Sequence, residues 1–428
     1  MSNPKEHKPK PHQTHRSNPF RTPETKTSVG MRKNFEGKKG QKTMDKVYYV
    51  SPKEQKTEVS LMDLLLGREY EDSTIPNTTS VKLRSQSWKP GKDYTTAQIV
   101  RFVQELKEYN EFTEKFRGMD RWNDLYTHFK LPKKSGGLRP IDAPVEEFSN
   151  ALTMLRLLIE KNIGGYFHHP CAFAYVKERC PVKLVEVHQK AESRWFAHFD
   201  FSNFFGSTTL DFVLRMCEKI YPLNRVMENP HGREELTKAL ELCFLNGGLP
   251  QGTPMSPFIT NIMMIPIDHE LLKFCGNQKP HLIYTRYADD IVISSKYDFD
   301  YRAVEKAIGS KLREFEAPFQ IKPEKTHYGS NAGRNWILGV MLNKDNKITI
   351  GHEVKKRFKA MLTNYIVGIK KGIFWDLDDV YEFQGKMSYY RSIEPDYINY
   401  VIQQYNNKFG VNVEALIKKQ IKGEPIAA

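Results

Sequence analysis

The chain has 428 residues, of which 39% are hydrophobic and 12% aromatic, so it can bury the core of one large multi-lobed domain or of two to three ordinary ones. Its net charge of +14 indicates a polyanionic partner, and nucleic acid is favoured over a membrane surface. The chain has no apolar run of about 18 residues and no apolar signal sequence. We therefore expect a cytoplasmic protein that does not span a membrane.

The cysteines are too few and too scattered for a zinc site or a disulfide framework. The chain contains five, none in a Cys-x-x-Cys pair: Cys171, Cys180, Cys217, Cys243 and Cys275. We predict that they are buried apolar residues in a reducing compartment.

The first 95 residues form two segments of different character. Residues 1–45 are polar, and residues 1–43 hold 11 Lys or Arg against 3 Glu, which is +8 of the net charge. Such a segment is predicted to be disordered, either as a solubilising tail or as an arm that orders on RNA or DNA. Residues 46–95 form an N-terminal extension with a strand-like piece, "KVYYV", and their role is not readable.

From residue 96 onward, helical and strand-like patterns alternate. A helix is predicted to begin after a cap at Thr95 or Thr96, and a hairpin spans Leu125–Pro144 around a Ser-Gly-Gly turn. The remaining expected elements are a helix at 148–163, a strand at 195–200, a long helix ending at 274, a hairpin at 284–296, a helix at 301–315, a hairpin at 336–350 and helices over 353–422. Ser256 and Pro257 are expected to shape the start of the long helix.

Two adjacent acids, Asp289 and Asp290, stand between apolar strands in "YTRYADDIVISSK". A solvated turn is one explanation, because aspartate is common in turns. The other is a metal site, since carboxylate clusters suit Mg²⁺ or Mn²⁺. Asp200 ends a further apolar strand, "WFAHFD", and pairing of these strands in one antiparallel sheet would bring Asp200 and Asp289 to the same volume. Two divalent ions would then have their ligands.

Five motifs occur in a fixed order: "LPKKSGGLRPIDAP", "FDFSNFF", "GLPQGTPMSP", "YADD", and a lysine before "ILGV". This order resembles that of bacterial reverse transcriptases over about residues 100–345. The resemblance implies an α+β fold shaped as a right-hand polymerase with an antiparallel sheet in the palm. It places the fingers at 96–190, the palm with part of the fingers at 191–345 and a helical thumb at 346–428.

The resemblance also implies roles for particular residues. Asp200, Asp289 and Asp290 correspond to the metal-binding catalytic acids, with the backbone carbonyl of Phe201 as a further ligand. Phe205 takes the place of the ring that excludes a ribose 2′-hydroxyl, whereas Phe204 is expected in the core. Lys325 corresponds to a lysine near the leaving pyrophosphate and could act as a general acid, or could be a surface lysine.

Other residues are implied in substrate binding. The residues expected to meet the incoming dNTP are Lys133, Lys134, Arg139, Phe205, Gln251 and Gly252, with Arg139 favoured because a guanidinium binds phosphate bidentately. A solvated turn is the alternative for Lys133 and Lys134. The residues expected to hold primer and template are Tyr287, Leu338, Gly339, Lys355, Lys356 and Arg357.

The chain departs from each familiar branch of the family. Before Asp200 it has "LVEVH", which keeps only the histidine of the retron Asn-Ala-x-x-His stretch, and it has "ILGV" where retron enzymes carry Val-Thr-Gly. We find no RNase H-like acidic set after the thumb. The resemblance is to retron-like and unknown-group reverse transcriptases of bacterial antiphage defence.

The expected partners are dNTPs, a DNA product and an RNA template, which this resemblance implies is a cognate non-coding RNA. A protein partner or oligomer is left open. Two alternatives to RNA-templated synthesis stand: a template-independent or protein-primed DNA polymerase on the same fold, and a non-catalytic RNA-binding scaffold. Intact acids argue against the scaffold, because buried like charges without metal cost stability.

Overall fold

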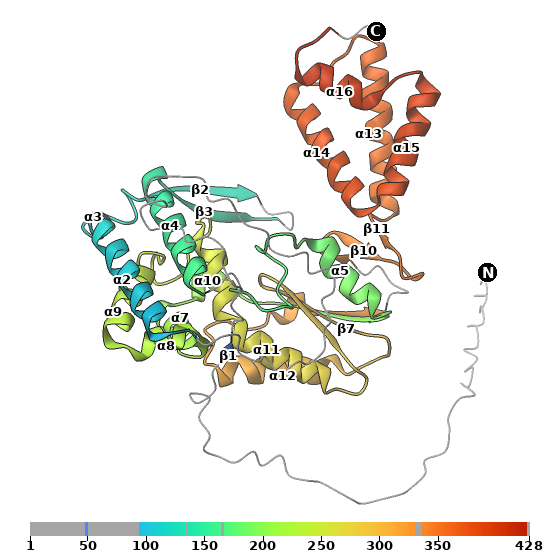
Figure 1. Cartoon of the computed structure of the whole chain (residues 1–428). Helices are drawn as coiled ribbons and strands as arrows, with labels where there is room; N and C mark the ends of the chain where they lie inside the picture. The colour runs from blue at the N-terminus through green and yellow to red at the C-terminus, as the bar shows by residue number, and fades with distance from the viewer. Residues whose placement is uncertain (1–47, 50–93, 133–135, 164–166, 331–335, 426–428) are drawn as a thin grey trace, which may run out of the picture. The chain divides into compact units, whose positions relative to one another are not determined.

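A computed structural model describes residues 48–49, 94–132, 136–163, 167–330 and 336–425 (Figure 1). The expected basic arm, most of the N-terminal extension, and Lys133 and Lys134 lie outside these ranges. Within the extension, the strand expected in "KVYYV" is confirmed: β1 (Tyr48–Tyr49) pairs in parallel with β5 (Ile220–Tyr221). Among the described helices, none has both the length and the apolar character needed to cross a bilayer.

The elements from residue 94 to 163 are helical apart from one hairpin: α2 (Thr96–Phe112), α3 (Glu114–Arg117), β2 (Tyr126–Pro132), β3 (Leu138–Pro144) and α4 (Glu146–Ile163). The predicted cap of α2 is confirmed as Thr95, whose hydroxyl accepts a hydrogen bond from the Gln98 amide while the Gln98 side chain accepts one from the Thr95 amide. The predicted hairpin is also confirmed, with seven residue pairs between β2 and β3.

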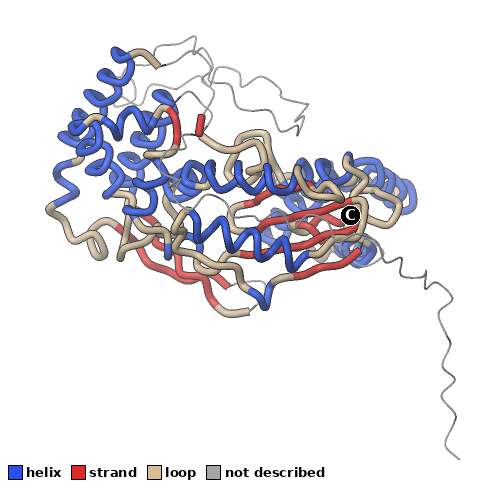
Figure 2. The backbone as a smooth tube through the Cα atoms, turned by 90° about the horizontal axis from the view of Figure 1, so that it is seen from below, coloured by secondary structure: helices blue, strands red, loops and turns tan. Residues whose placement is uncertain are grey.

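The middle of the chain contains a four-stranded antiparallel sheet with its covering helices. The elements of this part of the chain are α5 (Pro181–Lys190), β4 (Trp195–Asp200), α6 (Phe204–Ser207), α7 (Leu210–Cys217), β5, α8 (Leu223–Glu228), α9 (Pro230–Glu241), α10 (Met255–Met263), α11 (Ile265–Gly276), β6 (Ile283–Tyr287), β7 (Asp290–Ser295), α12 (Tyr301–Glu314), the 3-10 helix η2 (Pro323–Lys325) and β8 (His327–Ser330). The strand order is β6-β7-β4-β8. We call this sheet the palm sheet, and Figure 2 shows helices running alongside its strands.

The palm sheet is buried on both faces, and successive residues of each strand alternate between two cores. On one face Phe199, Ile291 and Ile293 pack in the core that contains the apolar residues of α11 and α12. On the other face Phe196 and Val292 pack with residues of α5 and of the small sheet that follows. Continuous apolar strands are what a sheet covered on both faces requires.

The last part of the chain is a small sheet followed by four helices: β9 (Trp336–Ile337), β10 (Val340–Leu342), β11 (Ile348–Thr349), α13 (His352–Lys370), α14 (Leu377–Ile393), α15 (Pro395–Phe409) and α16 (Val413–Ile421). The predicted hairpin is thus part of a three-stranded sheet of order β11-β10-β9. The four helices, which are the predicted thumb, contribute buried residues to one hydrophobic core, among them Phe358, Tyr365 and Phe383. The α+β fold class is confirmed.

Three local predictions need correction. The expected long helix is two helices, α10 and α11, because Pro266 near the start of α11 has no amide to continue the hydrogen-bond ladder. Ser256 does not cap α10. The hydroxyl of Thr253 instead accepts a hydrogen bond from the Ser256 amide, and the Ser256 hydroxyl donates one to the Pro250 carbonyl. Cys180 is exposed, since it stands at the turn before α5, whereas the other four cysteines are buried as predicted.

Candidate active site

The three acids meet where the central strands of the palm sheet end. Asp200 is the last residue of β4 and lies directly opposite Asp290, the first residue of β7. The prediction that these strands pair is therefore confirmed. In the register observed, Asp290 stands opposite Asp200 and Asp289 lies in the turn between β6 and β7. Asp289 is still tied to the end of β4, since its carbonyl accepts a hydrogen bond of 3.2 Å from the Phe201 amide.

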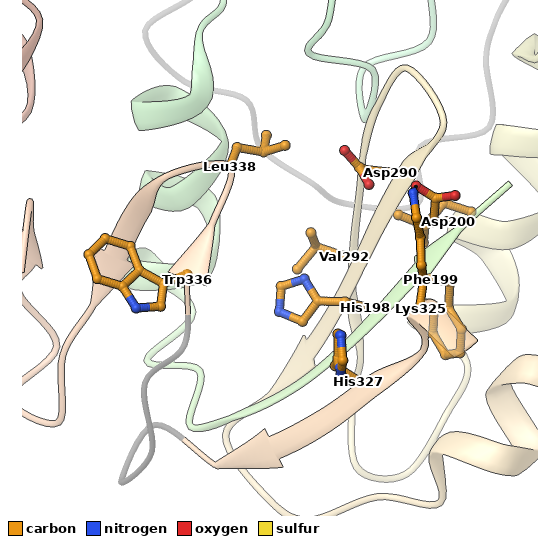
Figure 3. Close-up of a pocket in the computed structure, with 10 residues that line it drawn as sticks. His198, Phe199, Asp200, Asp290, Val292, Lys325, His327, Trp336 and Leu338 are labelled. Atoms are coloured by element: carbon orange, nitrogen blue, oxygen red, sulfur yellow. Dashed lines mark hydrogen bonds and ion pairs between the residues drawn. The ribbon is translucent and has the colours of Figure 1, made fainter. Parts of the chain in front are cut away.

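Asp200 and Asp290 point to the same face of the palm sheet. Residues 196, 198 and 200 alternate with the buried residues of the other face, as do 290 and 292, so the two carboxylates share the face of Phe196 and Val292. A cavity of about 460 Å³ opens on this face. Figure 3 shows both acids at one end of it. Its lining consists of His198, Phe199, Asp200, Asp290, Ile291, Val292, Lys325, His327, Trp336 and Leu338.

Two lysines hold the Asp200 carboxylate. The Nζ of Lys325 lies 2.7 Å from its Oδ2, and the Nζ of Lys322 lies 3.0 Å from its Oδ1. The 3-10 helix η2, which begins at Pro323, places both ammonium groups on one carboxylate, and the Lys322 amide also donates to the Asp200 carbonyl. Sequence reasoning selected Lys325 and missed Lys322. The signal available was the spacing of three residues in "KPEK".

The acids are in an electrostatically costly arrangement. Burial, together with the charges of Asp289 and Asp200, raises the pKa of Asp290 to about 7. Burial and the Asp200 charge also raise the pKa of Asp289. The hydrogen bond to Asp200 raises the pKa of Lys325, so this lysine stays protonated at neutral pH. Asp289 and Asp290, two partly buried carboxylates with raised pKa values, would be stabilised in their charged forms by added positive charge.

The donor set fits a hard divalent cation. The three acids offer only oxygen ligands, which Mg²⁺ and Mn²⁺ prefer. Phe201 follows Asp200 directly and its ring is buried against Phe319, so the backbone at this point is fixed. Its carbonyl can therefore serve as a rigid further ligand.

The two phenylalanines after Asp200 lie in different environments. Phe204 is buried and stacks on Phe201, whereas Phe205 is partly exposed and meets Phe204 edge to face. The Leu249 amide donates to the Phe205 carbonyl at 3.0 Å, which holds the short helix α6 against the loop before α10. Phe204 is thus a core ring as predicted, and Phe205 packs on the same core with part of its ring exposed.

The loop with Gln251 and Gly252 packs against the hairpin of β2 and β3. The Gln251 carbonyl accepts a hydrogen bond of 2.7 Å from the Asp142 amide. Gly252 has φ +121°, and a Cβ on it would lie 2.9 Å from Ile141, so this position requires glycine. Arg139 is exposed on β3. Gln251 and Gly252 therefore contact β3, the strand that carries Arg139.

The predicted primer-binding turn joins β9 and β10. Leu338 and Gly339 both have positive φ, +53° and +81°, as a two-residue turn between antiparallel strands requires. Leu338 lines the cavity opposite Asp290, as Figure 3 shows, and Tyr287 is the register partner of Asp290 on β6. Leu338 and Tyr287 therefore approach Asp290 from two different sheets.

The three predicted cations of α13 are not equivalent. The Nζ of Lys355 lies 2.6 Å from Oε1 of Glu394 and 4.1 Å from the ring centre of Tyr397. Its charge is therefore paired within the helical bundle. Of the three, Lys356 and Arg357 are therefore the two with exposed side chains.

Among the cavity residues that sequence reasoning missed, three carry a ring nitrogen: His198, His327 and Trp336. His198 and His327 are register partners on β4 and β8, and burial beside His327 lowers the pKa of His198 to about 4. His198 is therefore neutral at physiological pH. Only the two-residue spacing between His198 and Asp200 could have placed this histidine on the same face.

The sequence matches the family described as "Reverse transcriptase (RNA-dependent DNA polymerase)" over residues 131–355. It is 28% identical to the retron Ec83 reverse transcriptase of Escherichia coli over 307 residues, covering 70% of this chain and 91% of the relative. It is 25% identical to the retron Ec73 reverse transcriptase of the same species, covering 64% and 85%. A solved structure of Candida albicans telomerase aligns with a TM-score of 0.41 and 11% identity, covering 75% of this chain and 65% of that chain.

Proposed function

The chain belongs to the reverse transcriptase family of RNA-directed DNA polymerases, and from this premise we propose that it extends a 3′-hydroxyl with dNTPs by means of two divalent metal ions held by Asp200, Asp289 and Asp290. The observation that carries the proposal is the register of Asp200 opposite Asp290, with Asp289 in the adjoining turn. Mg²⁺ is the expected ion and Mn²⁺ the alternative.

The metal ions would lower the pKa of the attacking hydroxyl and stabilise the charge on the leaving pyrophosphate. The chain's own residues do the rest. Asp290 and Asp289, whose pKa values are raised by burial and by neighbouring acids, would hold the ions in their ionised forms. The ammonium of Lys325, which lies 2.7 Å from Asp200, would donate a proton to the leaving group.

The partly exposed ring of Phe205 selects the sugar. A ring at this place crowds a ribose 2′-hydroxyl, so dNTPs are preferred over ribonucleotides. Arg139 binds the triphosphate from β3, with Lys133 and Lys134 of the same hairpin as further cations, and Gln251 and Gly252 lie against the nucleotide. Tyr287, Leu338 and Gly339 hold the primer end, and Lys356 and Arg357 bind duplex phosphates, with Lys355 as a neighbouring cation.

The template is a cognate non-coding RNA, and the biological role is bacterial antiphage defence. Similarity to retron reverse transcriptases over most of their length supports the first part. The net charge of +14 agrees with an RNA or DNA partner. The defence role rests on resemblance to retron-like enzymes alone, so it is tested by itself: deletion of the gene should raise phage plating in its native host, and equal plating would exclude the role.

The activity is tested on the full chain purified with its native flanking DNA present in the host. The co-purified RNA is kept, dNTPs and Mg²⁺ are added, and the labelled product is sequenced. The matched control is the Asp289→Ala, Asp290→Ala double variant. DNA complementary to one co-purified RNA, absent with the control, is the expected result.

Other products would point to the alternatives. DNA without an RNA counterpart would indicate template-independent synthesis, and a product covalently linked to the chain would indicate protein priming. No product with any divalent ion would contradict the proposal and favour an RNA-binding scaffold.

A further inference from the structure

A fully buried ion pair lies directly behind the turn that carries Asp289. Arg286 on β6 and Asp268 on α11 are both completely inaccessible to solvent. The guanidinium binds the carboxylate through two nitrogens, with Nη2 2.7 Å from Oδ2 and Nε 2.9 Å from Oδ1. The hydroxyl of Tyr284 donates to the same carboxylate at 2.7 Å. Such a pair is geometrically rigid.

The free end of the guanidinium reaches the turn itself. Nη1 of Arg286 donates a hydrogen bond of 3.0 Å to the carbonyl of Ala288, the residue before Asp289. Ala288 has φ +56°, a left-handed conformation that costs free energy for a residue with a Cβ. The conformation at Ala288 determines where the chain reverses, and therefore where Asp289 and Asp290 stand.

The backbone of Arg286 is fixed as well. Its amide donates a hydrogen bond to the Cys171 carbonyl, and its carbonyl accepts one from the Phe173 amide, each 2.8 Å long. The segment around Ala172 thereby extends the palm sheet beside β6 as a parallel bridge. Arg286 is thus fixed by hydrogen bonds of its backbone, by its ion pair with Asp268 and by its hydrogen bond to the Ala288 carbonyl.

Resting on the proposed function of the acids, we propose that Arg286 is a positioning residue, which clamps Ala288 in its left-handed conformation and so sets the metal-binding geometry of Asp289 and Asp290. Stability alone does not account for the pair. Replacing a buried ion pair by apolar residues of similar volume is often neutral or stabilising. What an apolar pair cannot reproduce is the hydrogen bond to the Ala288 carbonyl.

The pair is also not a cation site in its own right. Ligand atoms of Asp268, His169 and Cys171 lie within 4.8 Å of one another, which is close enough to share an ion. Both oxygens of Asp268 are already bound by the Arg286 guanidinium. A permanent positive charge there repels a cation and leaves positioning as the role of the pair.

The test is Mn²⁺ binding to the full chain, measured by calorimetric titration without nucleotide, beside thermal melting of each variant. Arg286→Lys keeps the charge and loses the forked contact. The double variant Arg286→Met, Asp268→Leu keeps an apolar core in place of the pair. Tyr284→Phe is the matched control, because it removes a hydrogen bond to Asp268 and leaves the Ala288 contact intact. Asp289→Ala, Asp290→Ala identifies the binding that belongs to the acids.

We expect Mn²⁺ binding at the acids to weaken about 10-fold or more in both Arg286 variants, the range typical of residues that orient metal ligands. Tyr284→Phe should bind as the unaltered chain does. An Arg286 variant that melts cooperatively and binds Mn²⁺ normally would overturn the inference and leave the proposed function standing. Loss of folding in both variants would also overturn it, by showing a purely structural role. Absence of acid-dependent Mn²⁺ binding in the unaltered chain would instead contradict the proposed function.

Discussion

Asp200 closes β4 opposite Asp290, which opens β7, so two carboxylates from strands about 90 residues apart in sequence face the same cavity. Lys322 and Lys325 form ion pairs with Asp200. Burial and the neighbouring acids raise the pKa of Asp290 to about 7. Without the proposed metal ions, this arrangement of acids lowers the stability of the folded protein. Five predictions test it and the elements around it.

The first prediction is that Asp290→Asn abolishes DNA synthesis yet stabilises the metal-free protein. Because the pKa of this carboxyl is raised by folding, ionising it costs stability. That cost is absent below about pH 4, grows as the pH rises and is complete above about pH 7. Melting without metal at pH 8 should show a gain of about 1–2 kcal/mol that disappears at pH 4. Asp345→Asn, at an exposed acid of the β10–β11 turn, should change neither property; an equal gain there would refute the assignment.

The second prediction concerns sugar selection. Phe205→Ala should reduce the preference for dNTPs over ribonucleotides by about 10-fold or more, because the ring that crowds the 2′-hydroxyl is removed. Single-nucleotide incorporation with both sugars gives the ratio. Phe204→Leu changes the buried neighbouring ring. It should lower the free energy of unfolding by no more than about 1.5 kcal/mol and leave the preference for dNTPs unchanged. If the two variants change selectivity alike, the ring of Phe205 has no special role.

The third prediction separates two roles of Lys325. As a general acid it must release a proton, so both Lys325→Met and Lys325→Arg should lower kcat by about 100-fold. Rescue by arginine would reduce the role to electrostatics, since a guanidinium is not deprotonated in proteins. Lys322→Met is the matched control, because Lys322 binds the other oxygen of the same carboxylate. It should lower kcat much less.

A fourth prediction concerns the turn between β9 and β10. Gly339→Ala places a Cβ at φ +81°, a strain of about 1–2 kcal/mol. The dissociation constant for a primer–template duplex should rise roughly 5- to 30-fold as the turn shifts. Gly385→Ala, in α14 with open space around it, is the control and should bind normally. Unchanged duplex binding in Gly339→Ala would remove this turn from the primer site.

The fifth prediction distinguishes the cations of α13. Replacing the exposed pair Lys356 and Arg357 by alanine should lower the salt dependence of duplex binding by about one ion per residue. Lys355→Met should act differently, destabilising the helical bundle through the loss of its contact with Glu394. Melting curves and binding at several salt concentrations measure both effects. Equal effects of the three residues on the salt slope would contradict this division.

The strand ends could be predicted from sequence because the signal was local. "WFAHFD" and "DIVIS" are apolar runs bounded by acids, and each forms a strand that begins or ends at its acid. The cap at Thr95 and the hairpin over residues 126–144 were equally local. The predicted membership of the family is confirmed over residues 131–355.

What could not be predicted depends on contacts between distant segments. The register that sets Asp290, rather than Asp289, opposite Asp200 follows from the turn at Ala288. Lys322 looks like any surface lysine until η2 folds against β4. Arg286 gives no sign of its burial, because arginine is rarely buried unless paired, and its partner Asp268 lies 18 residues away.

The exposure of Cys180 makes one position of the chain chemically addressable. The other four thiols are buried, and burial raises the pKa of each of them above its ordinary value, so they are poor nucleophiles. A maleimide dye would therefore attach at a single defined point without any substitution. That point lies within electrostatic range of Tyr287 and Tyr389. A fluorophore there would sit beside the proposed primer end and could report each arrival and departure of a duplex in real time.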